Sequence, residues 1–373
     1  TNLAFVTDDK LNLLFSIDNP INEFSSEETQ NLVKALDKIK ILDPACGSGA
    51  FPMGILNRLV KLLEVLDPEN LYWKTLRING AQTKDNAEEM LKEIKQIFDM
   101  DKYTANYSRK LFLIENSIYG LDIQPMAIQI TKLRFFISLV IEQNIDESKP
   151  NNGILTLPNL ETKFLSVNSL VGLNISETHW SSLKITNYEK LTKDLNEVSH
   201  NLFFVRSTKE KQKYRKKYGE LREKIRNLLL EYNWDEVNVE KIFSWNPYLQ
   251  NAVSDFFDMD FMFDLRDDNK KKTKFDIVIG NPPYVRHEKI KDLKPLIKDQ
   301  YKTFTGTADI YIYFYELGYN VLKDGGLLSY ITSNKWTRAK YGQSFREFIL
   351  SNTDLVSYID FNGVKVFESA TVD

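Results

Sequence analysis

The chain has 373 residues, of which 42% are hydrophobic and 27% charged, and its formal net charge is −3. This composition is typical of a globular protein with a large core, and the length allows two or three domains. The sequence pI of about 5.9 argues against a dedicated, strongly basic nucleic-acid-binding protein. A local basic face remains compatible with it.

The numbers of cysteines and histidines argue against a disulfide-bonded protein and against a zinc-binding protein. The single cysteine, Cys46, excludes an internal disulfide and favours a reducing cytoplasm. The three histidines are scattered and give no zinc-ligand spacing; they are His179, His200 and His287. The apolar run 135–141 is far too short to span a bilayer, and the first residues show no signal-peptide pattern. We therefore expect a cytoplasmic protein without a metal site and without a membrane partner.

The first half of the chain alternates short apolar runs with helical patterns. Residues 1–37 are expected to be a helical or irregular lead-in. The predicted elements that follow, in chain order, are a buried strand at 39–43, a helix at 51–67 ended by Pro68, polar helices over 68–115, a second strand at 116–122, a helix that begins at Pro125, and a third strand with its exit loop at 161–170.

The composition changes between residues 176 and 270. This stretch is charged, has helical periodicity and shows no alternation of strands and helices, so we interpret it as a helical insertion. Within it, residues 206–226 carry ten Lys and Arg against three Glu. Such a run is usually a solvated helical face, but contact with nucleic-acid phosphates is an open alternative.

Alternation resumes after the insertion. The predicted elements are a buried strand from Phe275 to Ile279, a helix at 308–322, a strand at 325–333 after a Gly-Gly turn, a helix at 341–351, a strand at 355–361 and the start of another strand in the last ten residues. Strands alternating with helices imply an α/β fold with a doubly wound, mostly parallel sheet. We assign residues 38–175 and 271–373 to this sheet domain.

The stretch "FDIVIGNPPYVR" runs from a buried strand straight into two prolines. Proline has no N–H for a sheet and fixes φ, so Pro282 and Pro283 stop the strand and stiffen the loop. Asn281 and Tyr284 therefore lie on a stiff loop at the carboxyl end of a central strand. Open α/β sheets bind their ligands at this edge.

Two other strand ends point to the same edge. "DPACGSG", from Asp43 to Gly49, is a turn of small residues between a strand and a helix, which lets a ligand approach the backbone closely. Asp122 ends the second strand, where a carboxylate can accept hydrogen bonds from ribose hydroxyls. It follows the glycines by far more than the about 20 residues of a dinucleotide fingerprint, so an NAD site fits poorly.

Together these motifs reveal a family resemblance. "ILDPACGSGAF", "IYGLDIQPMAIQITKLRF" and "FDIVIGNPPYVR", in that order, resemble the gamma-class N6-adenine DNA methyltransferases. The resemblance covers about residues 38–170 and 274–373 and is strongest to methylase regions of type IIG-like restriction–modification and phage-exclusion enzymes. It implies a class I, Rossmann-like fold that uses S-adenosylmethionine (SAM) and acts on double-stranded DNA.

The resemblance also implies residue roles. The cradle for the methionine part of SAM would comprise Asp43, Ala45, Cys46, Gly47 and Gly49. Asp122 would hold the ribose, Ile123 would pack on the adenine of SAM, and Asn168 would bond its amino group. Around the target base, the implied residues are Asn281, Pro282, Tyr284 and Phe367, and Asn281 would also border the cofactor. The contact to the SAM carboxylate stays unassigned, because residues 1–37 lack the expected motif.

The chemistry of adenine N6 explains the Asn-Pro-Pro-Tyr motif. Its lone pair is delocalised into the ring, which makes it a poor nucleophile. The Asn281 amide oxygen and the Pro282 carbonyl can accept its two hydrogens, direct the lone pair toward the methyl group and stabilise the developing positive charge. Neither a metal ion nor a strong base is required.

Other functions remain as alternatives. A protein-glutamine or RNA amino-nitrogen methyltransferase can use a similar motif, and a non-catalytic DNA-binding subunit is a third reading. The triplets at 93–95 ("EIK") and 161–163 ("ETK") resemble half of a nuclease motif, but such triplets are common by chance. Cys46 has no histidine partner in sequence that would mark it as a nucleophile. We expect any nuclease to lie elsewhere in the polypeptide or operon. The domain that reads the DNA sequence is expected downstream of these residues, in a longer polypeptide.

Overall fold

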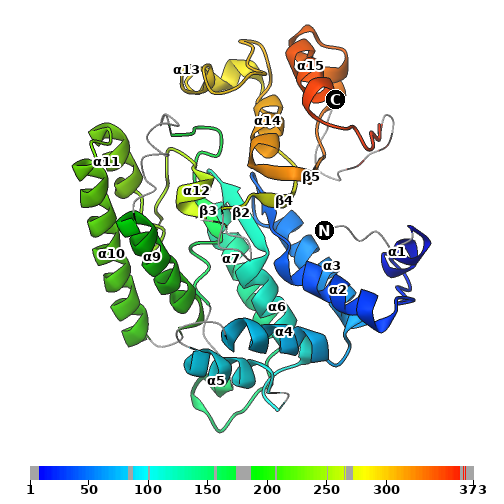
Figure 1. The fold of residues 1–373 in the computed structure, drawn as a ribbon. Coiled ribbons are helices and arrows are strands. Elements are labelled where there is room, and N and C mark those ends of the chain that lie inside the picture. Colours follow the sequence, from blue (N-terminus) through cyan, green and yellow to red (C-terminus); the bar gives the residue numbers. More distant parts are fainter. Residues whose placement is uncertain are drawn as a thin grey trace.

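A five-stranded parallel sheet forms the centre of the computed structural model (Figure 1). The structure describes residues 8–361 except 83–86, 100, 155–157, 174–185, 206–207, 250, 264 and 266–271, and in addition residues 364 and 366. The strands are β1 (Ile41–Asp43), β2 (Ile118–Asp122), β3 (Phe164–Ser166), β4 (Phe275–Gly280) and β5 (Leu322–Tyr330). Their spatial order is β3-β2-β1-β4-β5.

β1 lies in the middle of the sheet, and the chain winds outward from it in both directions. Ile41 pairs with Ile118 of β2 on one side and with Ile277 of β4 on the other. The direction of winding reverses between β1 and β4, which is the position where α/β sheets bind ligands. The predicted doubly wound parallel sheet is thus confirmed, and the ends of β1, β2 and β4 meet at its carboxyl edge.

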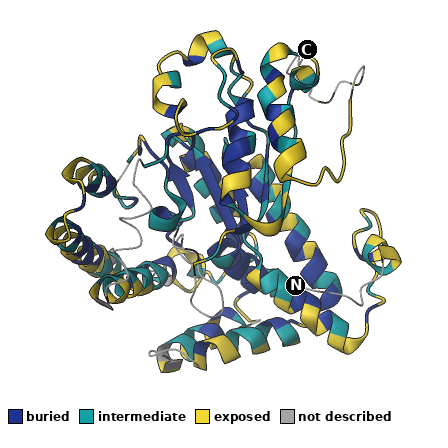
Figure 2. Cartoon of the chain, turned by 45° about the horizontal axis from the view of Figure 1, so that its top comes forward, coloured by how far each residue is buried: buried dark blue, intermediate teal, exposed yellow. Residues whose placement is uncertain are grey.

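Successive residues of β1 and β2 enter different hydrophobic cores. Ile41 and Ile118 belong to one core, whereas Leu42 and Tyr119 belong to the other. Side chains of a strand alternate between the two faces of its sheet, so both faces are covered. Figure 2 shows the strands as a buried centre whose covering helices expose only their outer sides.

The first face is covered mainly by helices from the first 140 residues. These are α2 (Ser26–Lys38), α3 (Ala50–Leu66), α4 (Leu71–Gln82), α5 (Ala87–Ile97), α6 (Ala105–Asn116) and α7 (Pro125–Val140). The lead-in also contains α1 (Asp8–Leu14), whose Leu14 is buried in this core. α2 begins with a capping box between Ser25 and Glu28, a motif that satisfies otherwise unpaired N–H groups.

The second face is covered by helices from the remainder of the chain. These include α14 (Tyr311–Val321) and α15 (Gln343–Asn352), together with α10 (Thr208–Glu231), α11 (Glu236–Ser244) and α12 (Met259–Met262) of the 176–270 segment. α9 (Thr186–Phe204) packs beside α10 (Figure 1). Short helical turns occur at η1 (Pro150–Gly153), η2 (His287–Ile290), α13 (Lys294–Ile297), η3 (Asn334–Thr337) and η4 (Lys340–Gly342).

The 176–270 segment is rich in charged residues, but it also contributes large apolar side chains to the protein core. Trp234 and Trp245 are buried in the same core as the strands. Arg222 is also buried; its guanidinium donates to the Ile242 and Phe243 carbonyls near the end of α11. One member of the basic run therefore satisfies a helix terminus inside the protein.

The structure contradicts two strand predictions near the carboxyl end. Residues 355–361 form no strand; they are exposed, with 84% of Val356 accessible, because no neighbouring strand pairs with them in the described part of the chain. The Gly-Gly pair is not a turn before β5 but an irregularity inside it. Phe275 of β4 pairs with Leu322, and Ile277 pairs already with Leu327, so β5 bulges around Gly325 and Gly326.

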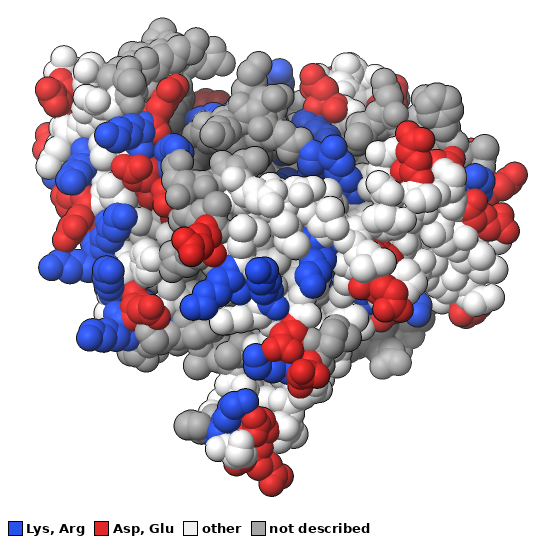
Figure 3. Space-filling model, turned by 60° about the horizontal axis from the view of Figure 1, so that its bottom comes forward, with Lys and Arg blue, Asp and Glu red and all other residues white. Residues whose placement is uncertain are grey.

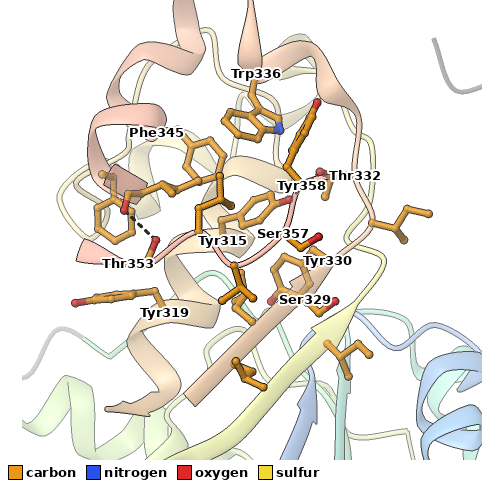
Figure 4. Close-up of a pocket in the computed structure, with 18 of the residues that line it drawn as sticks. Tyr315, Tyr319, Ser329, Tyr330, Thr332, Trp336, Phe345, Thr353, Ser357 and Tyr358 are labelled. Carbon is orange, nitrogen blue, oxygen red and sulfur yellow. Dashed lines mark hydrogen bonds between the residues drawn. The ribbon is translucent and has the colours of Figure 1, made fainter. Parts of the chain in front are cut away.

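A broad cavity of about 2370 Å³ borders β5 on its outer side. Aromatic side chains from α14, β5, η3, α15 and the segment after α15 surround this space; among them are Tyr315, Tyr330, Trp336, Phe345 and Tyr358 (Figure 4). No helix in the described ranges is long and apolar enough to cross a membrane.

Candidate active site

The loop after β1 depends on two glycines. Gly47 and Gly49 have φ values of +54° and +83°, which side chains other than glycine rarely adopt. A β-carbon at Gly49 would lie 2.8 Å from Thr131 of α7, so glycine also permits close packing there. A β-carbon at Gly47 would meet nothing within 4 Å. The loop is thus tightly folded against α7 and faces open space at Gly47.

The N–H groups of this loop are largely used within the protein. Cys46 donates to the Leu121 carbonyl at 2.7 Å, and Gly49 donates to the Cys46 carbonyl at 2.8 Å. Ala45 donates to Asp43 Oδ1 at 3.1 Å. A phosphate-binding loop keeps such donors free for its ligand. The N–H groups of Ala45, Cys46 and Gly49 are therefore not available to a ligand.

Asp122 joins the ends of β1 and β2. Its Oδ2 accepts from the Gly47 N–H at 2.9 Å, and its Oδ1 accepts from the Gln124 N–H at 2.8 Å. Each carboxylate oxygen has a second lone pair, and the side chain is only partly buried. Asp122 can therefore hold the glycine loop and still accept hydrogen bonds from a ligand.

Asp43 connects the glycine loop to the Asn-Pro-Pro-Tyr loop. Its side chain is buried, and a β-carbon at Gly280 would lie 2.6 Å from its Oδ1. Burial raises the pKa of Asp43 to about 7, and the negative charge of Asp122 adds to this shift. The two predicted motifs are thus in direct contact, across a position where only glycine fits.

Cys46 is buried beneath β2. A β-carbon at Gly120 would lie 2.9 Å from its Sγ, and burial, with Asp43 and Asp122 nearby, raises the pKa of the thiol. The nucleophilic form of cysteine is the thiolate, which this environment disfavours. The geometry gives Cys46 a packing position in the loop.

The loop after β4 is anchored at both ends. At its start, Ile331 donates to the Gly280 carbonyl at 3.2 Å; at its end, Ile310 donates to the Val285 carbonyl at 3.1 Å, and the His287 N–H donates to Asp309 at 3.2 Å. Pro282 between these anchors is buried. The loop is held as a rigid segment at the carboxyl edge.

Tyr284 lies beside Asn281 on this loop. Its hydroxyl oxygen is 2.6 Å from Asn281 Oδ1 and 2.9 Å from the Ile331 carbonyl oxygen. The ring meets Tyr311 edge to face, with 6.3 Å between centroids, and the residue is 36% exposed. Burial raises the pKa of Tyr284 to about 12, so the phenol is neutral near pH 7.

The exit of β3 has a partner that the sequence did not indicate. Ser254, from the 176–270 segment, donates its N–H to the Ser166 carbonyl at 2.9 Å and accepts from the Asn168 N–H at 2.8 Å. The Ser169 hydroxyl donates to the Pro44 carbonyl at 2.8 Å, which joins this exit to the glycine loop. No local pattern marks either serine, since both contacts join distant parts of the chain.

Most of the predicted site residues therefore gather at one edge of the sheet. The carboxyl ends of β1, β2, β3 and β4 bring in Asp43, Ala45, Cys46, Gly47, Gly49, Asp122, Ile123, Asn168, Asn281, Pro282 and Tyr284. Ile123 is 59% exposed. Phe367 lies outside the described residues. Within the described ranges, no group of His, Cys, Asp and Glu could hold a metal ion.

The basic run in α10 is partly engaged in internal contacts. Arg215 pairs with Glu161 at 3.6 Å, and Arg226 pairs with Glu240, whereas Lys213 and Lys217 are exposed. On the face in Figure 3, Lys and Arg side chains are interspersed with Asp and Glu and form no continuous basic surface. The contact of α10 with nucleic acid stays a prediction.

The parallel sheet, with its reversal at β1 and its motif loops at one edge, defines a Rossmann-like α/β protein. Residues 116–367 match the family model of the Eco57I restriction-modification methylase. The chain belongs to this family. The matched region includes Asp122 and the whole Asn-Pro-Pro-Tyr loop.

Curated relatives agree with this family. The type II methyltransferase M.XhoI of Xanthomonas vasicola is 40% identical over 96 residues, which are 26% of this chain and 18% of the relative. The type II restriction enzyme and methyltransferase RM.Eco57I of Escherichia coli is 31% identical over 141 residues, 37% of this chain and 12% of the relative. The putative enzyme of the same kind from Methanocaldococcus jannaschii, RM.MjaORFECS2P, is 33% identical over 162 residues, 42% of this chain and 11% of the relative. The chain thus spans less than a fifth of the length of these relatives.

Proposed function

We propose that this chain is the catalytic region of a DNA methyltransferase. It transfers a methyl group from SAM to the N6 amino group of an adenine extruded from double-stranded DNA, within a restriction–modification or phage-defence system. The observation that best supports this proposal is the contact between Asp43 and Gly280. It places the glycine loop, which would bind the methyl donor, beside the Asn-Pro-Pro-Tyr loop, which would bind the amino group.

The glycine loop fits SAM better than it fits a nucleotide with phosphates. SAM has no phosphate and carries a positive sulfonium, and this loop offers few free N–H groups but two nearby carboxyl groups, Asp43 and Asp122. Gly47 and Gly49 would border the methionine part, Asp122 the ribose, and Ile123 and Asn168 the adenine. Once bound, SAM supplies an electrophilic methyl group.

The Asn-Pro-Pro-Tyr loop fits an amino group with two hydrogens to donate. Asn281 Oδ1 and the Pro282 carbonyl are the two acceptors, and the prolines and backbone anchors fix them before the substrate arrives. Acceptors fixed in advance stabilise the charge that develops on nitrogen without reorganising. The partly exposed ring of Tyr284 would stack on the extruded base.

The relatives support a DNA substrate and a nuclease partner. Two of those named above are called both restriction enzyme and methyltransferase. We therefore propose double-stranded DNA as the partner of this chain, with a nuclease domain or subunit in the same polypeptide or operon.

The test is methyl transfer by the full-length protein. Labelled SAM is incubated with duplex DNA, structured RNA or peptides that contain glutamine, and the products are digested and identified by mass spectrometry. N6-methyladenine in DNA, absent with Asn281→Ala, is the expected product. Label in RNA or peptide, or at cytosine N4, would replace the proposed substrate.

A further inference from the structure

The hydroxyl of Tyr284 has one proton and two acceptors. Asn281 Oδ1 lies 2.6 Å from it and the Ile331 carbonyl oxygen lies 2.9 Å from it. A phenol donates a single hydrogen bond, so only one of these two oxygens receives the proton at a time. The shorter distance is the one to Asn281.

The ring of Tyr284 cannot easily leave this arrangement. Its edge-to-face contact with Tyr311 fixes it on one side, and the anchored backbone of the loop fixes its Cα. The Ile331 carbonyl belongs to the segment directly after β5, and the Ile331 N–H donates to Gly280. Hydroxyl, amide and carbonyl are thus parts of one rigid unit that spans the ends of β4 and β5.

We propose that the Tyr284 hydroxyl is a positioning group that orients the Asn281 carboxamide toward the target amino group. This inference rests on the proposed function and is separate from stacking by the ring. The hydroxyl holds Oδ1, rather than the amide nitrogen, at the position where an acceptor is needed. An amide that rotated would present hydrogens to an amino group that also carries hydrogens.

The arrangement also accommodates the target base. Asn281 Oδ1 can accept two hydrogen bonds, so it can keep the hydrogen bond from the Tyr284 hydroxyl, 2.6 Å away, and accept a second one from the target amino group. The orientation of the amide is therefore kept when the base arrives.

This role predicts how the effect depends on pH. Because burial raises the pKa of Tyr284 to about 12, the hydroxyl keeps its proton over the range in which methyl transfer is assayed. Loss of the hydroxyl should lower kcat by the same factor at pH 6.5 and at pH 8.5. A group that acted by exchanging protons would give a factor that changes with pH.

The kinetic test compares Tyr284→Phe with Tyr284→Ala and with Tyr315→Phe in the full-length protein. Tyr315→Phe is the matched control, because its hydroxyl contacts Thr332 at 3.0 Å and not Asn281. Tyr284→Phe should lower kcat about tenfold, the value of one hydrogen bond, with KM unchanged. A 2-aminopurine at the target position should stay as bright as with the wild type. Tyr284→Ala should lose more turnover and also change the 2-aminopurine signal, and Tyr315→Phe should stay within about twofold.

A spectroscopic test needs no activity. In protein with ¹⁵N-labelled asparagine, the side-chain amide signals of Asn281, assigned with Asn281→Ala, should shift in Tyr284→Phe and stay in place in Tyr315→Phe. Unchanged amide signals, or a Tyr284→Phe kcat within twofold of the wild type, would overturn the positioning role. If the signals shift but the wild type methylates no DNA, the proposed function fails while the contact between Tyr284 and Asn281 is supported.

Discussion

The glycine loop and the Asn-Pro-Pro-Tyr loop lie at the same edge of the sheet but are fixed by different means. The first uses glycines with positive φ and spends its N–H groups on Asp43, Leu121 and Asp122. The second uses prolines and keeps carbonyl-type oxygens available at Asn281 and Pro282. These differences fit the proposed ligands, which are cationic SAM at the first loop and an amino group at the second.

The largest effect is expected from a substitution in the Asn-Pro-Pro-Tyr loop, which should lower methyl transfer without weakening SAM binding. Asn281→Ala should reduce methyl transfer by at least about a hundredfold, since one preorganised partner of the developing charge is removed. SAM affinity, measured by calorimetry, should change less than twofold. Asn281→Asp is the matched variant, because it keeps an acceptor oxygen and should retain part of the activity. Transfer by Asn281→Ala within tenfold of the wild type would remove Asn281 from the chemistry.

A substitution of Asp122, which holds the glycine loop, should instead weaken SAM binding. Asp122→Ala should weaken SAM binding about tenfold to a hundredfold, because hydrogen bonds to a charged group contribute about 1.5–3 kcal/mol. The SAM affinity of Asp122→Asn should lie between those of the wild type and Asp122→Ala, because its single acceptor oxygen can keep only one of the contacts to Gly47 and Gln124. Unchanged affinity by calorimetry would mean that Asp122 only ties the loop together.

Asp43 should make the first loop sensitive to pH. Its pKa is raised to about 7, so it is mostly protonated below that value and ionised above it. The positive sulfonium favours the ionised carboxylate, and SAM affinity should rise about fivefold between pH 5.5 and 8, an effect of about 1 kcal/mol. Asp43→Asn should bind SAM with a flat pH profile. A wild-type profile that is equally flat would contradict the placing of the sulfonium near Asp43.

The smallest effect is expected outside both loops, on α10. If Lys213, Lys216 and Lys217 bind DNA phosphates, replacing them with Gln should lower the slope of log K against log salt by nearly one for each phosphate that is no longer neutralised. Arg215 is left in place because it pairs with Glu161 at 3.6 Å, whereas the pair of Lys216 with Glu220 is exposed and 4.0 Å long. The binding of duplex DNA is measured at several salt concentrations. A constant slope would identify these lysines as a solvated face.

Much of the sheet could be predicted because its central strands are continuous apolar runs that are followed by polar residues or proline. β1, β2 and β4 fall within two residues of their predicted positions for this reason. The prediction of a strand at 355–361 was wrong. An apolar pattern indicates which side chains can be buried, but it does not indicate whether a neighbouring strand is present to pair with them. The bulge at Gly325 and Gly326 depends on the register with β4, which no local pattern contains.

The site was predictable in its location but not in its contacts. Strand ends in a parallel sheet meet at one edge, so Asp43, Asp122 and Asn281 could be grouped from their positions after strands. The contact of Asp43 with Gly280, and that of Asn168 with Ser254, join residues far apart in sequence. The role of the Tyr284 hydroxyl could not be foreseen either, because its second acceptor, Ile331, comes from the segment after β5.

The free side of β5 has a consequence for the chain in concentrated solution. In the described part of the chain, β5 is an edge strand that pairs only with β4, and its Leu327 is 57% exposed. Such an edge is a template on which strands of other copies can add, and charges at Lys323 and Asp324 protect only its first half. Self-association of the isolated chain would begin at β5, and a short peptide that pairs with this strand would suppress it.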